Sequence, residues 1–84
     1  MIDVLFFASV REKMGCSKIQ LPAQATLKTI MDVLQHIDEE FQSDLVRQYH
    51  DKKLIIAHNQ EISDASASVK SGDEVAFFPP VSGG

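Results

Sequence analysis

The chain has few of the residues on which metal and redox chemistry depends. Its 84 residues include one cysteine and no tryptophan. A single cysteine, Cys16, excludes an internal disulfide and a cysteine-based metal cluster. Only Lys18 offers a positive charge close enough in sequence to activate the thiol. We therefore interpret Cys16 as a small apolar strand residue and not as a catalytic nucleophile.

Other catalytic patterns are also missing from the sequence. The three histidines, His36, His50 and His58, follow no metal-ligand spacing. No glycine-rich phosphate loop, Ser/His/Asp set or pair of carboxylates stands out. A chain this short forms one domain and buries roughly 60–65% of its unfolded surface, which leaves little room for an enclosed substrate pocket. We expect a protein that is not catalytic alone and binds neither a cofactor nor a metal.

Basic clusters and long apolar runs are absent as well. The net charge is −4, and Lys52-Lys53 is the only adjacent basic pair, so no nucleic acid partner is expected. The apolar start is interrupted by Arg11 and Glu12, which argues against a signal peptide or a membrane span. We expect a cytoplasmic protein. Its acidic surface suits a basic protein partner, and it equally suits plain solubility.

Alternation of apolar side chains predicts the strands. In residues 2–8 one face carries Ile2, Val4, Phe6 and Ala8, and the more open face carries Asp3, Leu5 and Phe7. Residues 16–21, 54–57, 61–63 and 74–78 are the other predicted strands, and the first two strands are expected to pair antiparallel.

One long amphipathic helix is predicted, with Thr26 as its N-cap. Its apolar face consists of Leu27, Ile30, Met31, Leu34, Ile37 and Phe41. Residues 9–14 and 43–49 are expected to form short helical segments. One main helix packed on one mixed sheet is an α+β roll.

The last six residues differ from the rest. Pro79 and Pro80 fix the backbone and remove two amide donors, so the final strand must end there. Six extended residues reach about 20 Å. Gly83 and Gly84 carry no Cβ and fit a slot too narrow for side chains. We predict a domain over residues 1–78 and a flexible, extended tail over residues 79–84, shaped to place the terminal carboxylate in another protein's active site.

Three stretches carry a family resemblance: residues 1–8, Arg11-Glu12, and residues 72–84, which end in Phe-Phe-Pro-Pro-Val-Ser-Gly-Gly. The chain resembles the small, sulfur-carrier subunits of molybdopterin synthase from end to end. The resemblance implies the ubiquitin-like β-grasp fold. It also implies that the Gly84 carboxylate is adenylylated with ATP by a ubiquitin-activating-like adenylyltransferase. A persulfide protein would then supply sulfur, giving a Gly84 thiocarboxylate.

The same resemblance implies the partners. The thiocarboxylate would enter the large synthase subunit and donate sulfur to cyclic pyranopterin monophosphate, within a heterotetramer of two small and two large subunits. The open faces of the first and last strands form an apolar patch if these strands are neighbours. By resemblance, the partner-facing residues are Phe7, Arg11, Ile62 and Phe78, with Pro79, Pro80, Val81 and Ser82 of the tail.

Three alternatives remain open at this point. One is a sulfur carrier of another pathway, such as the thiamine type, although those carriers are usually shorter and lack the Phe-Pro-Pro-Val segment. Another is a ubiquitin-like modifier whose Gly84 is joined to lysines of target proteins. The last is a binding domain in which the tail has no role.

Overall fold

The computed structural model describes residues 1–80 of the chain. Five strands form one mixed sheet in the order β2-β1-β5-β3-β4. β1 and β5 run parallel at its centre, and the other neighbouring pairs are antiparallel. The strands are β1 (Ile2–Phe6), β2 (Lys18–Leu21), β3 (Ile55–His58), β4 (Glu61–Ser63) and β5 (Glu74–Phe78).

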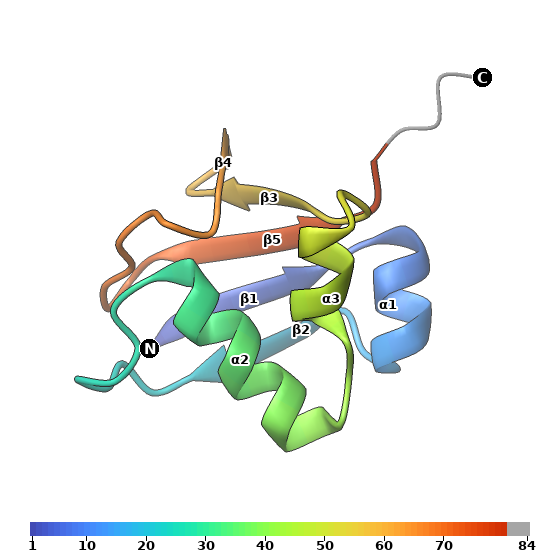
Figure 1. Cartoon of the computed structure of the whole chain (residues 1–84). Coiled ribbons are helices and arrows are strands. Elements are labelled where there is room, and N and C mark those ends of the chain that lie inside the picture. Colours follow the sequence, from blue (N-terminus) through green and yellow to red (C-terminus); the bar gives the residue numbers. More distant parts are fainter. Residues whose placement is uncertain (81–84) are drawn as a thin grey trace.

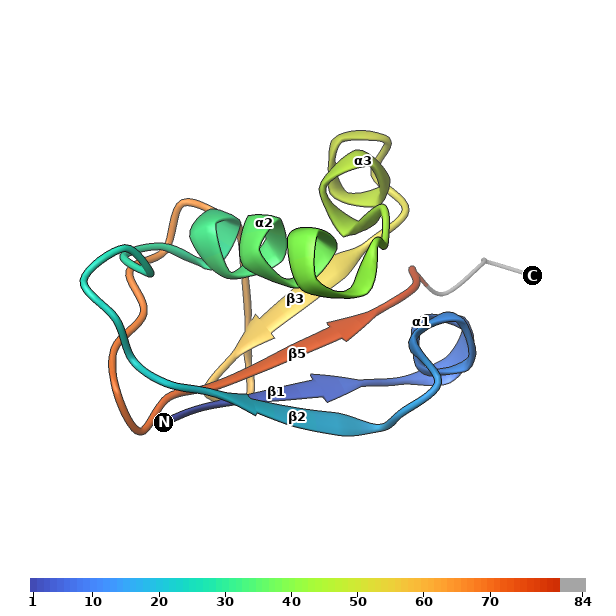
Figure 2. The same cartoon turned by 90° about the horizontal axis from the view of Figure 1, so that it is seen from below.

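Three helices accompany the sheet: α1 (Ala8–Met14), α2 (Ile30–Phe41) and α3 (Leu45–His50). Figures 1 and 2 show α2 and α3 on one face of the sheet and α1 at the end where β1 and β5 finish. No helix of the described residues covers the opposite face (Figure 2). This arrangement confirms the predicted α+β roll and leaves one side of the sheet open.

The core lies between the sheet and α2. Its largest fully buried side chains include Phe6 and Phe77, paired across the central strands with ring centroids 6.3 Å apart. Ile2, Val4 and Phe6 are buried as the alternation predicted. Ala8 is exposed, because the chain turns into α1 at Phe7 and the alternation ends there.

The main helix begins three residues later than predicted. Its N-cap is Thr29, and Thr26 lies exposed in the preceding turn. Thr29 Oγ1 accepts a hydrogen bond from the Asp32 amide at 3.3 Å, and the Asp32 carboxylate accepts one from the Thr29 amide at 3.0 Å. This reciprocal capping box satisfies two amides that the first helical turn leaves free. Phe41, predicted to be in the apolar face, is 43% exposed at the helix end.

The N-terminus of the short helix α3 is capped by a side chain of α2. Asp44 occupies the N-cap position without a side-chain bond to the helix backbone. The Asp38 carboxylate of α2 instead accepts hydrogen bonds from the amides of Leu45 and Val46, at 2.8 and 3.0 Å, and from Ser43 Oγ at 2.6 Å. A carboxylate at a helix N-terminus also interacts favourably with the helix dipole. Asp38 therefore fixes the angle between α2 and α3.

Candidate partner-binding face

The two central strands determine which side chains reach the open side of the sheet. β1 and β5 are neighbours, as the apolar-patch interpretation required, and Leu5 lies opposite Ala76. Because Phe6 and Phe77 point into the core, their neighbours along each strand point the other way. The open side therefore receives alternate residues from both strands.

Phe7 and Phe78 meet where these strands end. Their rings are edge to face, with centroids 6.5 Å apart and planes at 82°. The Phe7 amide donates to the Phe77 carbonyl at 3.1 Å, and the Phe7 carbonyl accepts the first amides of α1, from Val10 and Arg11. These bonds hold the Phe7 backbone in place while its side chain remains 46% exposed.

A single row of side chains crosses the open side on all five strands and begins at Lys18 of β2, opposite Leu5. Leu5 and Ala76 lie at its centre, Ala57 of β3 follows, and Ile62 of β4 is at the edge. Ile62 is 73% exposed, the largest exposed fraction among the large apolar side chains of the described residues. Ala76 is buried and Leu5 and Ala57 are half-buried, so Ile62 is the exposed apolar side chain of this row.

Ile55 joins this surface although the sequence analysis did not single it out. It lies opposite Phe78 in the antiparallel β3–β5 pair and is half-buried. Residues 54–57 read as a continuous apolar run, in which no alternation separates inward from outward side chains. The apolar sheet face is hereafter the set of Leu5, Phe7, Ile55, Ala57, Ile62, Ala76 and Phe78.

Polar side chains occupy the end of the open side that lies away from Phe78. Gln20 donates to Asp3 at 2.8 Å, and Lys18 Nζ lies 3.8 Å from the Asp3 carboxylate. Glu74 is the residue opposite Asp3 on β5. The open side is thus apolar toward the C-terminal end of β5 and charged toward its beginning.

Arg11 and the prolines lie around the apolar end. Arg11 is exposed on α1 and forms no ion pair within residues 1–80. β5 ends at Phe78, as the two following prolines predicted; Pro79 is half-buried and Pro80 exposed. The remaining predicted site residues, Val81, Ser82, Gly83 and Gly84, lie outside the described residues.

The sequence analysis missed a pair formed by the half-buried His58 and the buried Asp73. His58 Nε2 lies 2.9 Å from Asp73 Oδ2, and Asp73 also accepts from Asn59 and from the Lys70 amide. Burial raises the pKa of Asp73, but these hydrogen bonds outweigh burial, so its pKa lies below the ordinary value. The pair ties the turn before β5 to the β3–β4 hairpin, at the end of β5 opposite the tail. Its role is structural.

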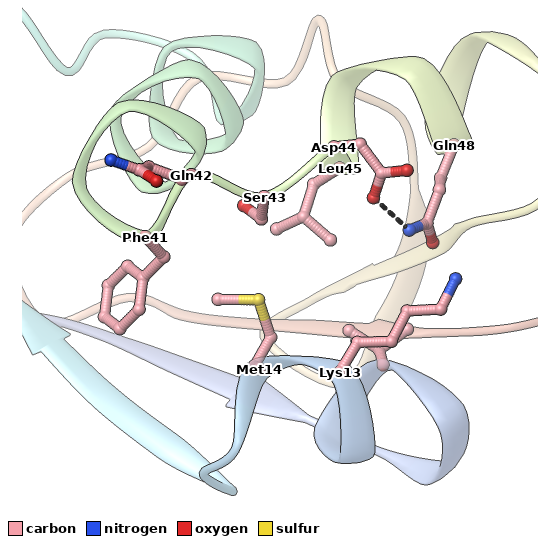
Figure 3. Close-up of a pocket in the computed structure, with 9 residues that line it drawn as sticks. Lys13, Met14, Phe41, Gln42, Ser43, Asp44, Leu45 and Gln48 are labelled. Atoms are coloured by element: carbon pink, nitrogen blue, oxygen red, sulfur yellow. Dashed lines mark hydrogen bonds between the residues drawn. The ribbon is translucent and has the colours of Figure 1, made fainter.

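A separate hollow lies on the helical side, between α1 and the α2–α3 junction (Figure 3). Met14 and Phe41 line it together with Lys13 and Asp44, so its charges are mixed. Cys16 is half-buried and packs against the core as an apolar residue does, but it lies two residues before β2 and not in a strand as predicted. Among residues 1–80 no helix is long and apolar enough to span a membrane. In the same residues, no three side chains of His, Cys, Asp or Glu are grouped so that they could hold a metal ion.

The chain is similar to known proteins over its whole length. The sequence model of the ThiS family matches residues 4–84. The molybdopterin synthase sulfur carrier subunit of Haemophilus influenzae is 40% identical, and that of Escherichia coli 42%, each over the full length of both chains.

Solved structures confirm the predicted β-grasp fold. SAMP1, the small archaeal modifier protein 1 of Haloferax volcanii, is 25% identical and superposes with a TM-score of 0.81, covering 99% of this chain and 98% of that one. A complex of subunits 1 and 2 of the molybdopterin-converting factor of Helicobacter pylori contains a chain that is 20% identical. That chain superposes with a TM-score of 0.64, and the match covers 99% of this chain and 97% of that one, so the two share the fold.

The identity of about 40% is far above what a shared fold requires, and the matches cover the chain to its last residue. It confirms the family predicted from the sequence, and with it the role of a sulfur carrier that is not catalytic alone. This chain therefore belongs to the ThiS family and, within it, to the sulfur carrier subunits of molybdopterin synthase.

Proposed function

We propose that Gly84 carries sulfur as a C-terminal thiocarboxylate and donates it to cyclic pyranopterin monophosphate. The observation that carries this proposal is the family match, which extends to Gly84 itself. The folded domain supports it in a second way. Its open side offers an apolar surface next to the point where the chain leaves β5, as a carrier that docks and inserts its terminus requires.

Activation of Gly84 follows from carboxylate chemistry. A carboxylate resists attack by sulfur until it bears a good leaving group. In the proposed sequence the carboxylate attacks the α-phosphorus of ATP on an adenylyltransferase, and pyrophosphate leaves. The terminal sulfur of a persulfide then attacks the acyl carbon and AMP leaves. A thiol reduces the resulting acyl–persulfide link, which releases the thiocarboxylate. The carrier supplies only its terminus, and the ATP is bound by the activating enzyme.

The large subunit of molybdopterin synthase is the proposed sulfur-accepting partner. We assign the apolar sheet face and Arg11 to its interface, with the tail, residues 79–84, entering its active site. Exposed Phe7 and Ile62 fit the apolar centre of such an interface, and Arg11 its polar rim. A dithiolene contains two sulfur atoms, so each pterin consumes two loaded carriers, for which a heterotetramer provides two sites.

The proposal extends to the bounds of the domain and to the cellular compartment. The domain comprises residues 1–78, because the last strand ends at Phe78, and residues 79–84 form the tail. The proposed place of action is the cytoplasm, where the reducing environment keeps a single cysteine as a free thiol.

Two other roles share the activation step. A thiamine-type carrier would use the same thiocarboxylate for another acceptor. A protein modifier would join Gly84 to lysines, and the likeness to SAMP1 gives this reading its support. That likeness rests on 25% identity, whereas the sulfur carriers of molybdopterin synthase reach 40% and 42%.

The test is the intact mass of the chain after incubation with ATP, the adenylyltransferase and a persulfide donor. We expect an AMP adduct, followed by a species in which sulfur has replaced one oxygen, and neither in a variant lacking Gly84. Adenylylation without sulfur, with Gly84 found in an isopeptide bond, would support the modifier. Neither species, with an enzyme proven active on another carrier, would refute the proposal.

A further inference from the structure

A groove lies at the sheet edge where β4 ends. Its volume is about 520 Å³, and its walls come from α3, from β3 with the loop before it, and from β4. Most of its lining is apolar, with Tyr49, Leu54, Ile55 and Ile62 contributing. The volume falls in the range of roughly 300–1,000 Å³ typical of clefts that hold ligands.

The groove exists because β4 is shorter than its neighbour. β4 stops at Ser63, opposite Ile56, so Ile55 pairs with β5 on one side and with no described strand on the other. The chain then leaves the sheet and returns to α3, where the Ala65 amide donates to the Tyr49 hydroxyl at 3.0 Å. That bond holds the ring of Tyr49 as a fixed wall, so the groove is a preformed feature.

The polar lining of the groove includes basic but no acidic side chains. Lys52 and His50 line it and no acidic side chain does so among the described residues, whereas the exposed charged residues close in sequence are of both signs: Arg47, Asp51, Lys53, Glu61 and Asp64. The hollow of Figure 3, in contrast, contains both Lys13 and Asp44. In a protein of net charge −4, an apolar floor lined on one side by Lys52 and His50 fits a ligand that pairs an apolar side chain with a carboxylate.

The groove is continuous with the apolar sheet face. Ile55 and Ile62 belong to both, and Ile55 lies directly opposite Phe78, whose ring contacts Phe7. A partner covering Phe7 and Phe78 therefore reaches the groove without crossing a polar gap. Stable interfaces bury about 800 Å² on each partner, and the groove adds area to the apolar sheet face.

We propose that the groove takes an acidic segment of the large synthase subunit. An apolar side chain of that segment lies on Tyr49, Leu54 and Ile62, and its carboxylates face Lys52 and His50. The inference rests on the proposed function for the identity of the partner. It adds a second docking site, whose charge selects the partner and whose floor extends the apolar sheet face.

The test compares Lys52→Glu with Lys70→Glu in the full chain, by calorimetric affinity for the large subunit at low and at physiological salt. Both residues are exposed lysines, but Lys70 precedes the turn at the opposite end of β5. We expect Lys52→Glu to weaken binding tenfold or more and to reduce the salt dependence of the affinity. Lys70→Glu should change the affinity less than twofold. Equal effects of the two variants would overturn the proposal.

Two further measurements separate the alternatives. Zero-length carbodiimide coupling joins amines to carboxylates in contact, so we expect a Lys52 product with an acidic residue of the large subunit. Coupling of Lys52 only to a second copy of this chain would overturn the inference.

Thiocarboxylation by the activating enzyme should be unchanged in Lys52→Glu; its loss would assign the groove to that enzyme instead. If the unaltered chain fails to bind the large subunit, the proposed function itself is wrong, whereas normal binding of Lys52→Glu refutes the groove alone.

Discussion

The rings of Phe7 and Phe78 stand edge to face, 6.5 Å apart, although the two residues lie near opposite ends of the chain. The parallel pairing of β1 and β5 brings them together, and Phe7 remains 46% exposed. The strands hold both rings in place, yet the ring of Phe7 remains accessible to another molecule. Edge-to-face aromatic pairs are stable, and exposed ones mark surfaces that another molecule covers.

Replacing Phe7 by alanine should therefore weaken binding to the large subunit about tenfold to a hundredfold, as loss of a central aromatic contact does. Phe41→Ala is the matched control, because Phe41 is similarly exposed, at 43%, but lies on the helical side. Calorimetric titration of both variants gives the comparison. Similar losses of affinity would mean that the apolar sheet face is not the interface.

A second prediction concerns Gly83. Gly83→Ala adds a Cβ where the proposed entry to the partner's active site is narrow. We expect single-turnover sulfur transfer to slow tenfold or more, with an unchanged thermal unfolding midpoint. Ser82→Ala serves as the control, since it makes a nearby side chain smaller. Full transfer activity in Gly83→Ala would contradict a tight channel.

Asp38 should matter more for stability than Asp44. Asp38→Ala removes three hydrogen bonds at the start of α3, and we expect the free energy of unfolding to fall by about 1–2 kcal/mol. Asp44 occupies the formal N-cap position, but its side chain accepts only from the Gln48 side chain among the described residues, so Asp44→Ala should cost less than about 0.5 kcal/mol. Denaturant titration distinguishes the two. An equal loss would mean that the bonds from Asp38 contribute little.

The lowered pKa of Asp73 predicts an acid-dependent stability. The folded state favours the ionised carboxylate, so its contribution is complete above the unfolded pKa of about 4 and is lost as pH falls through the folded value. Asp73→Asn should lower the free energy of unfolding by about 1–3 kcal/mol at pH 7. The difference from the unaltered chain should shrink below about pH 4. A difference that stays constant from pH 7 to pH 3 would contradict this account.

Most of the strand pattern could be predicted from the sequence, because buried and open side chains alternate in β1 and two prolines end β5. The same alternation placed Phe7 and Phe78 on the open side. The tail was likewise predicted from its own residues, of which 81–84 lie outside the described part of the chain. These features are local, so each is decided by neighbours along the chain.

Features that depend on contacts between elements were not predicted. The sequence pattern placed the helix cap at Thr26, whereas the reciprocal bonds between Thr29 and Asp32 place it at Thr29. His58 meets Asp73 because of the register between β3 and β5, which no spacing in the sequence reveals. The groove beside Ile55 arises because β4 stops early.

The central claim is that Gly84 delivers sulfur to the pterin. The most direct measurement is a single turnover of purified thiocarboxylated chain with the large subunit and cyclic pyranopterin monophosphate, in which the carrier mass and the dithiolene product are followed together. We predict that the carrier returns to the plain carboxylate as product appears, with two carriers consumed for each dithiolene. A carrier that keeps its sulfur, or that loses it without forming a dithiolene, would contradict the account.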